Sequence, residues 1–139
     1  MTESTGAIAW AIGLLAADAT VTGLVSTRVY DSLAPQDTDE PYIIIQQQAY
    51  SEDGTSIAGD IGAGRMMLTV KAVTQSAGFA SAEAIYKAAH AAIQGQTGNV
   101  SGAIIHSCIR DSVIRYPEIS RGVRYNHLGG VYRMFVSPA

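Results

Sequence analysis

Apolar residues recur with the helical period near the N-terminus. Residues Gly6–Ala17 (GAIAWAIGLLAA) contain no charged side chain, and Ser4 or Thr5 is the expected cap in front of them. One face of this predicted helix holds Ile8, Ala11, Ile12 and Leu15, and a second apolar stripe holds Trp10 and Leu14. A helix that is apolar around so much of its circumference is buried in the fold or shared with a neighbouring subunit.

A second long helix is predicted over Ser81–Gln94, with Gly95 as its terminator. Its apolar positions follow the helical period and are Ala82, Ile85, Tyr86, Ala89 and Ile93. Asp18 is a candidate cap for a short helical turn over Thr20–Leu24. The pattern therefore predicts two main helices and one short one.

The first strands are indicated by β-branched residues and by alternation. Pro41–Gln48 (PYIIIQQQ) begins with the proline that a strand tolerates at its first position, and Arg65–Ser76 alternates apolar and polar residues. We expect these two strands to pair. A short extended piece is predicted at Val29–Asp31, followed by a connection rich in turn formers at Ala34–Glu40.

The glycine-rich stretch Ala49–Gly64 (AYSEDGTSIAGDIGAG) has no sustained periodicity and predicts a long loop or the tip of a β-ribbon. Gln96–Gly102 predicts a turn. Two further strands are predicted over Ala103–Tyr116 and Arg121–Val136, joined by a turn at Pro117–Ser120. The adjacent glycines Gly129 and Gly130 predict a bulge or bend in the last strand.

These elements predict an α+β fold, with a mostly antiparallel sheet of about four strands, two main helices and a long glycine-rich loop. A length of 139 residues fits a single domain over residues 1–139. The chain begins MTES, without the positive charge of a secretory leader, and its apolar run of twelve residues is too short for a membrane span. We therefore expect no targeting segment and no membrane partner.

Charge is sparse and unevenly distributed. Charged residues make up 15% of the chain, against about 25% in typical soluble domains. Residues 1–60 hold nine acids and one base, whereas residues 61–139 hold three acids and eight bases. Either the charges interleave once the chain folds, or an acidic and a basic flank associate head to tail, the geometry that closes into rings.

Motifs for catalysis or for cofactor binding are absent from the sequence. The glycine-rich stretch lacks the Gly-Lys-Ser/Thr ending of a phosphate loop, and it precedes a strand rather than a helix. His90, His106 and His127 are not spaced as metal ligands, and Cys108, the single cysteine, has no paired base in the sequence. We expect no enzyme activity, no cofactor and no metal site.

Five arginines gather on the last two predicted strands, and tyrosines lie among them. The arginines are Arg110, Arg115, Arg121, Arg124 and Arg133. Arginine and tyrosine are enriched at protein interfaces, and basic residues among aromatics also bind single-stranded nucleic acid. Because the sequence pI is about 5.5, we expect a protein interface or an ordinary solvated face of the sheet, and no specific nucleic-acid binding.

The order of elements resembles that of the tail terminator (tail completion) proteins of long-tailed bacteriophages and gene transfer agents. The resemblance covers roughly residues 7–138. It is carried by the N-terminal helix, GLVSTRVYDSLAP leading into PYIIIQ, RMMLTVKAVT, SAEAIYKAAHAAIQG and the closing strands that end in GGVYRMFVSP.

The resemblance implies a structural, non-enzymatic virion protein. Such a protein forms a homo-oligomeric, hexameric ring on the head-proximal end of the tail tube, stops tube polymerisation and offers a surface to neck or head-completion proteins. It implies assembly in a bacterial host cytoplasm and a final location in the virion tail. The candidate interface residues are Glu52, Asp53, Asp60, Arg65, Arg110, Arg115, Arg121 and Arg124.

Within such a ring, we expect Ser51–Gly64 to order against the tube or the neighbouring subunit, and some late arginines to meet acids of the adjacent chain. Two alternatives stay open. One is a head-tail connector or another neck protein, which would bind on the capsid side. The other is a small α+β enzyme or ligand-binding module with a pocket beneath the long loop.

Overall fold

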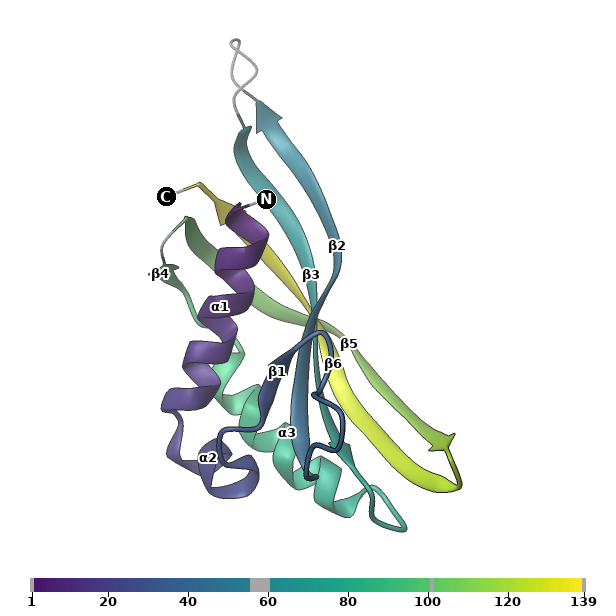
Figure 1. Cartoon of the computed structure of the whole chain (residues 1–139). Coiled ribbons are helices and arrows are strands. Elements are labelled where there is room, and N and C mark those ends of the chain that lie inside the picture. The colour runs from purple at the N-terminus through teal and green to yellow at the C-terminus, as the bar shows by residue number, and fades with distance from the viewer. Residues whose placement is uncertain (1, 56–60, 101, 139) are drawn as a thin grey trace.

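A strongly twisted six-stranded sheet forms the framework of the described chain (Figure 1). The computed structural model describes residues 2–55, 61–100 and 102–138. The strand order is β1-β2-β3-β6-β5-β4. The strands are β1 (Val29–Asp31), β2 (Tyr42–Thr55), β3 (Ile61–Thr74), β4 (Gly98–Val100), β5 (Ala103–Ser120) and β6 (Val123–Ser137).

The α+β class is confirmed, but the expected sheet of about four strands is too small. Strand β1 pairs with β2 in parallel, whereas the other neighbours are antiparallel, so the sheet is mixed. Strand β4 lies within residues predicted to be a turn. The short extended piece predicted at Val29–Asp31 is confirmed as β1, whereas β4 is only three residues long, which is too short for alternation to reveal it.

Three helices, α1 (Thr2–Ala17), α2 (Ala19–Val25) and α3 (Ala80–Ile93), lie against one face of the sheet (Figure 1). The side chain of Asp18 accepts hydrogen bonds of 3.0 Å from the amides of Thr20 and Val21, which confirms it as the cap of α2. Helix α1 begins at Thr2, so Ser4 and Thr5 lie inside it and the predicted cap is wrong.

The five predicted apolar positions of α3 are all buried, and Gly95 follows the helix with a φ of +75°. Together with α1, α2 and the strands, they form one hydrophobic core. Its largest fully buried side chains include Leu15, Ile43, Met66, Leu68, Ile93 and Tyr132. The core lies between the helices and the middle of the sheet.

The predicted long loop is mostly strand. Strands β2 and β3 pair from Tyr42 and Val73 to Thr55 and Ile61, and they form a ribbon that extends beyond α1 (Figure 1). Of the two expectations, the β-ribbon tip is therefore nearer to the structure than a sixteen-residue loop. The strand residues in this glycine-rich stretch were not predicted, because glycine has low β-propensity. Residues 56–60 lie outside the described chain.

The turn of the β5–β6 hairpin lies four residues later than predicted. Pro117–Ser120 belongs to β5, and the connection consists of Arg121 and Gly122, whose φ angles are +53° and +78°. A two-residue turn with both φ angles positive matches the twist of the strands. An arginine at the first turn position, where asparagine is usual, concealed this turn in the sequence.

The predicted bulge at Gly129-Gly130 is also wrong. These glycines pair in regular register with Lys71 and Val70, and the irregularities lie on β5, between Ile105 and Ser107 and between Arg110 and Ser112. Glycine is required for a different reason. A Cβ at Gly129 would press against the backbone of β3, and a Cβ at Gly130 would press against the Tyr86 hydroxyl.

No single helix of the described chain is long and apolar enough to cross a bilayer. Residues 4–17 and α2 reach that length only together, and they are bent by 87° where they meet.

Candidate functional site

The end of the β5–β6 hairpin projects away from the helices (Figure 1). We define the distal hairpin as residues 109–125. In its first strand every residue from 109 to 120 is exposed except Ile114, which is half-buried. Four large apolar side chains of the distal hairpin are at least 40% exposed: Ile109, Val113, Tyr116 and Ile119. A hairpin with this composition is suited to contact with another molecule.

Two arginines enclose an aromatic ring on the helix side of the hairpin. The guanidinium of Arg115 lies 4.3 Å from the ring centroid of Phe79, at the start of α3, and that of Arg124 lies 5.8 Å from it. Strand alternation places Val113 and Ile119 on the same side as Arg115. We call this surface the basic face: Phe79, Val113, Arg115, Ile119 and Arg124.

The geometry of the basic face depends on Asn126. Its amide donates to the carbonyls of Ser76 and Gly78 at 2.6 and 2.9 Å, which ties the hairpin to the segment before α3. The Asn126 side-chain oxygen accepts a 2.8 Å hydrogen bond from Arg124 Nε. The hydrogen bond with the buried Asn126 therefore holds the Arg124 side chain beside Phe79.

The opposite side of the hairpin carries a stacked pair. The rings of Tyr116 and His127 are 4.5 Å apart and nearly parallel, and Lys71 Nζ donates to the Tyr116 hydroxyl at 2.9 Å. His127 Nε2 donates to Glu118 at 3.0 Å, while its buried Nδ1 has no partner among the described residues. Burial lowers the pKa of His127, and the hydrogen bond with Glu118 opposes that shift.

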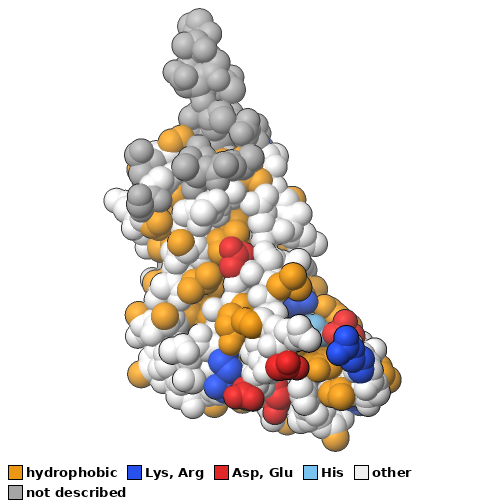
Figure 2. All heavy atoms as spheres, viewed as in Figure 1, with side chains coloured by type: hydrophobic (Ala, Val, Ile, Leu, Met, Phe, Trp, Pro, Cys, Tyr) orange, Lys and Arg blue, Asp and Glu red, His pale blue; other side chains and the backbone are white. Residues whose placement is uncertain are grey.

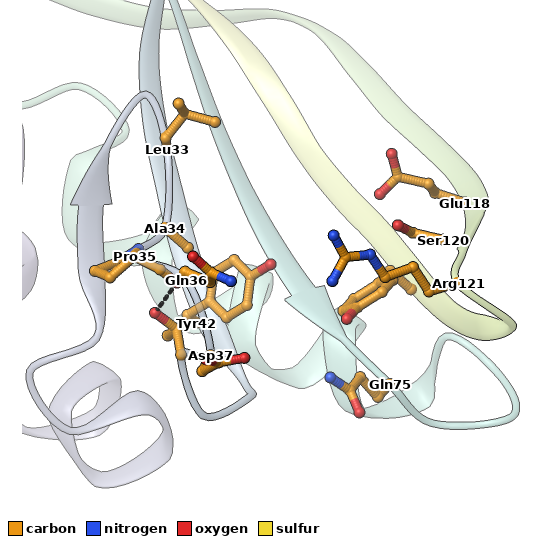
Figure 3. Close-up of a pocket in the computed structure, with 12 residues that line it drawn as sticks. Leu33, Ala34, Pro35, Gln36, Asp37, Tyr42, Gln75, Glu118, Ser120 and Arg121 are labelled. Carbon is orange, nitrogen blue, oxygen red and sulfur yellow. Dashed lines mark hydrogen bonds between the residues drawn. The ribbon is translucent and has the colours of Figure 1, made fainter.

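A hollow of about 740 Å³ lies on this second side (Figure 3). One wall is the connection after β1, with Leu33 and Asp37, and the other wall is the hairpin end, with Glu118, Ser120 and Arg121. Tyr42, at the start of β2, also lines the hollow, and burial followed by the charges of Tyr125 and Glu118 raises its pKa. The two carboxylates of the hollow, Asp37 and Glu118, come from opposite walls, and Glu118 is bonded to His127.

We define the acidic segment as residues 31–40 (DSLAPQDTDE). It holds four acids, Asp31, Asp37, Asp39 and Glu40, and no base. All four are exposed, and none makes an ion pair within the described chain. Leu33 is 82% exposed among them. Figure 2 shows charged side chains of both signs mostly in the lower half of this view, away from the β2–β3 ribbon.

Four polar groups meet under α3. The buried Tyr132 hydroxyl lies 2.9 Å from the Tyr86 hydroxyl and 2.7 Å from His90 Nδ1, and Arg110 donates to Tyr86 at 3.4 Å. Burial and the hydrogen bond to Tyr86 raise the pKa of Tyr132, whereas burial and then Arg110 lower the pKa of His90. Because each hydroxyl has a partner, this cluster joins α3 to the sheet.

The predicted interface residues are dispersed. Arg115 and Arg124 meet on the basic face, Arg121 forms the turn, and Arg110 lies against α3. Arg65 lies on the far side of the sheet with Arg133, beside a hollow of about 220 Å³. Glu52 and Asp53 belong to β2, but their side chains are not described, and Asp60 lies outside the described residues.

Sequence reasoning missed Phe79, Leu33 and Ile119. None of them belongs to a motif. The only signal was an isolated large apolar residue in a polar stretch, which also occurs on ordinary surfaces. Their role depends on neighbours that only the fold supplies.

The described residues do not assemble a metal site. No group of three histidine, cysteine or carboxylate side chains there is close enough to hold a metal ion. Cys108 is buried, and burial raises the pKa of its thiol to about 12, so it stays protonated near neutral pH.

Comparison with known proteins gives two positive findings. The family model described as tail completion protein gp17 matches residues 12–137. A chain of a solved structure, "Virion of native gene transfer agent (GTA) particle", is similar with a TM-score of 0.72 and 22% identity, covering 95% of this chain and 96% of that chain. A search of curated proteins found no match. At this identity the structural likeness concerns the fold.

Proposed function

The chain belongs to the tail completion protein gp17 family, and on that premise we propose that it forms a ring on the head-proximal end of a tail tube. There it ends tube polymerisation and provides the joint to neck or head-completion proteins. Membership in the family makes it a structural tail protein of a bacteriophage or phage-like particle, located in the virion tail. We propose that it has no enzymatic activity.

The exposed distal hairpin is the observation that carries this proposal. A chain with few charges nevertheless exposes Val113 and Ile119 at 56% and 76% on a projecting hairpin. Both lie on the face of the hairpin that carries Arg115, and apolar side chains exposed on one projecting face are suited to a contact surface. We infer that a neighbouring copy of the chain covers this hairpin in the assembled, hexameric ring.

The β2–β3 ribbon is the second contact of the proposed ring. It extends from the end of the molecule opposite the distal hairpin (Figure 1). Its end includes most of the segment Ser51–Gly64, which we propose orders against the tube or a neighbouring subunit. Two projections at opposite ends give each copy two separate contact surfaces in the assembled tail.

Solution mass tests the ring. The purified chain is measured by light scattering coupled to size exclusion, alone and after addition of assembled tail tubes. We expect a species of about six copies, alone or only with tubes, and tubes that stop growing when it is added. A chain that stays monomeric and leaves tube growth unchanged contradicts the proposal and directs attention to a ligand in the 740 Å³ hollow. A ring that binds isolated necks but not tubes indicates a neck protein.

Ile119→Asp locates the contact. Because Ile119 is exposed, this change should alter the free energy of unfolding by less than about 0.5 kcal/mol, yet prevent the ring. Leu24→Asp, at an exposed apolar position on α2, is the matched control. Rings from Ile119→Asp that match the wild type would exclude the hairpin from the interface.

A further inference from the structure

We propose that the basic face of one copy docks on the acidic segment of the next copy, so that the contact runs head to tail. This inference rests on the proposed ring and names the two surfaces that would build it. The surfaces are the basic face, where Arg115 and Arg124 lie against Phe79, and the acidic segment, residues 31–40.

The basic face is ordered before it meets a partner. Arg115 and Arg124 both lie against the Phe79 ring, and Arg124 is also bonded to the buried Asn126. Neither arginine makes an ion pair with a described residue. Two guanidiniums held in place lose little side-chain freedom on binding a carboxylate, and their remaining N–H donors suit it.

The acidic segment has the complementary composition. Asp37 and Asp39 are exposed, and neither side chain has a hydrogen bond or an ion pair within the described chain. The backbone between them is braced, because the Thr38 hydroxyl donates to the carbonyl of Pro35. Leu33 adds an apolar side chain that is 82% exposed, which matches the exposed Val113 and Ile119 of the basic face.

The two surfaces cannot meet within one copy. Asp37 lines the 740 Å³ hollow together with Glu118, Ser120 and Tyr125. Successive strand residues point to opposite faces, so Arg124 points away from the side of Tyr125, and Ile119 away from the side of Glu118. The basic face therefore lies on the other side of the sheet from the wall that Asp37 forms.

Complementary patches on different sides of one chain produce a heterologous contact. Each copy offers its basic face to one neighbour and its acidic segment to the other, and a suitable rotation closes the series into a ring. A second copy is the favoured occupant because it presents charge and exposed apolar side chains together. Nucleic acid would match the arginines but would leave Leu33, Val113 and Ile119 without a partner.

Two charge variants test this contact. The first, Arg115→Glu with Arg124→Glu, makes the basic face acidic. The second, Asp37→Asn with Asp39→Lys, leaves two of the four acids of the acidic segment and adds one base, and asparagine suits the φ of +61° at position 37. Lys87→Glu, on the exposed side of α3, controls for a change of charge alone. Thermal unfolding of each variant establishes that it is folded.

We expect each double variant to lose the ring when it is alone. The arginine variant places acids opposite acids, and the acidic-segment variant loses the two carboxylates that carry the contact and places a lysine opposite the arginines. In an equimolar mixture, the wild-type basic face of one meets the wild-type acidic segment of the other, and the two altered surfaces are also complementary. The mixture should therefore recover a ring with both chains in equal numbers, as read by native mass spectrometry with tail tubes present. Lys87→Glu should assemble normally.

Normal assembly of either double variant alone, or no recovery on mixing two folded variants, overturns this contact and leaves the proposed ring standing. Loss of the ring by the arginine variant with normal assembly of the acidic-segment variant would assign the arginines to another partner, such as the tube, and also overturns it. Failure of the wild-type chain to assemble with or without tubes contradicts the proposed function itself.

Discussion

Strands β5 and β6 each pass through two environments. In the half covered by helices, Ala103, Ile105 and Cys108 of β5 are buried, and on β6 so are most residues from 126 to 136. In the distal hairpin the same strands expose Val113, Ile119 and three arginines. The two strands stay paired from one half to the other, with an irregularity of β5 at the boundary, between Arg110 and Ser112. The helices cover only the first half, which accounts for the difference in burial.

This contrast separates stability from assembly. Side chains under the helices contribute to the free energy of unfolding, whereas those on the distal hairpin contribute little to it until a partner covers them.

Isoleucine at two positions gives the sharpest contrast. Ile93, at the end of α3, is fully buried, and Ile93→Ala should cost about 2–5 kcal/mol of the free energy of unfolding. Ile119→Ala removes the same atoms from an exposed side chain and should change it by less than about 0.5 kcal/mol. Chemical denaturation measures both, and similar losses would contradict the division into two regions.

A glycine pair tests the sheet beneath the helices. A Cβ at Gly129 would lie 2.5 Å from the Lys71 Cα, so Gly129→Ala should cost about 1–3 kcal/mol or more. Gly13→Ala is the control, because nothing lies within 4 Å of its Cβ and alanine favours a helix by about 0.5–1 kcal/mol. Tolerance of Gly129→Ala would mean that β3 and β6 can separate locally without loss.

Acid should weaken the fold through two histidines, His90 under α3 and His127 at the base of the hairpin. The pKa of each imidazole is lowered in the fold, mainly by burial. Below about pH 6.5, the ordinary pKa of histidine, the unfolded chain therefore binds more protons than the folded chain. Stability is therefore fully present above that value and is lost as the pH falls from about 6.5 toward the lowered pKa values of the folded chain.

Thermal unfolding between pH 7.5 and 5.5 measures this effect. This pH range lies above the pKa values of most carboxyl groups. His90→Gln and His127→Gln should each reduce the fall in the melting temperature over this range. A double variant with an undiminished fall would assign the acid sensitivity to other groups. A larger reduction from His90→Gln would place the sensitivity in the helix-covered region.

Much of the helix-covered region was predictable, because periodicity reports burial directly. The α3 positions from Ala82 to Ile93, the Asp18 cap and the pairing of the Ile43–Ile45 strand with its neighbour all follow from local patterns. The distal hairpin was predictable only as two strands with arginines. Its turn was misplaced because Arg121 adopts a positive φ that arginine rarely has.

The sequence by itself determined the fold class, the main helices, the long strands and the separation of acids from bases along the chain, since these depend on side-chain period and composition. Only the tertiary structure decided that Phe79 lies between Arg115 and Arg124, and that these face away from Asp37. The physical reason is that such contacts join residues distant in the chain. Strand alternation and the extent of the helices set which side of the sheet each one occupies.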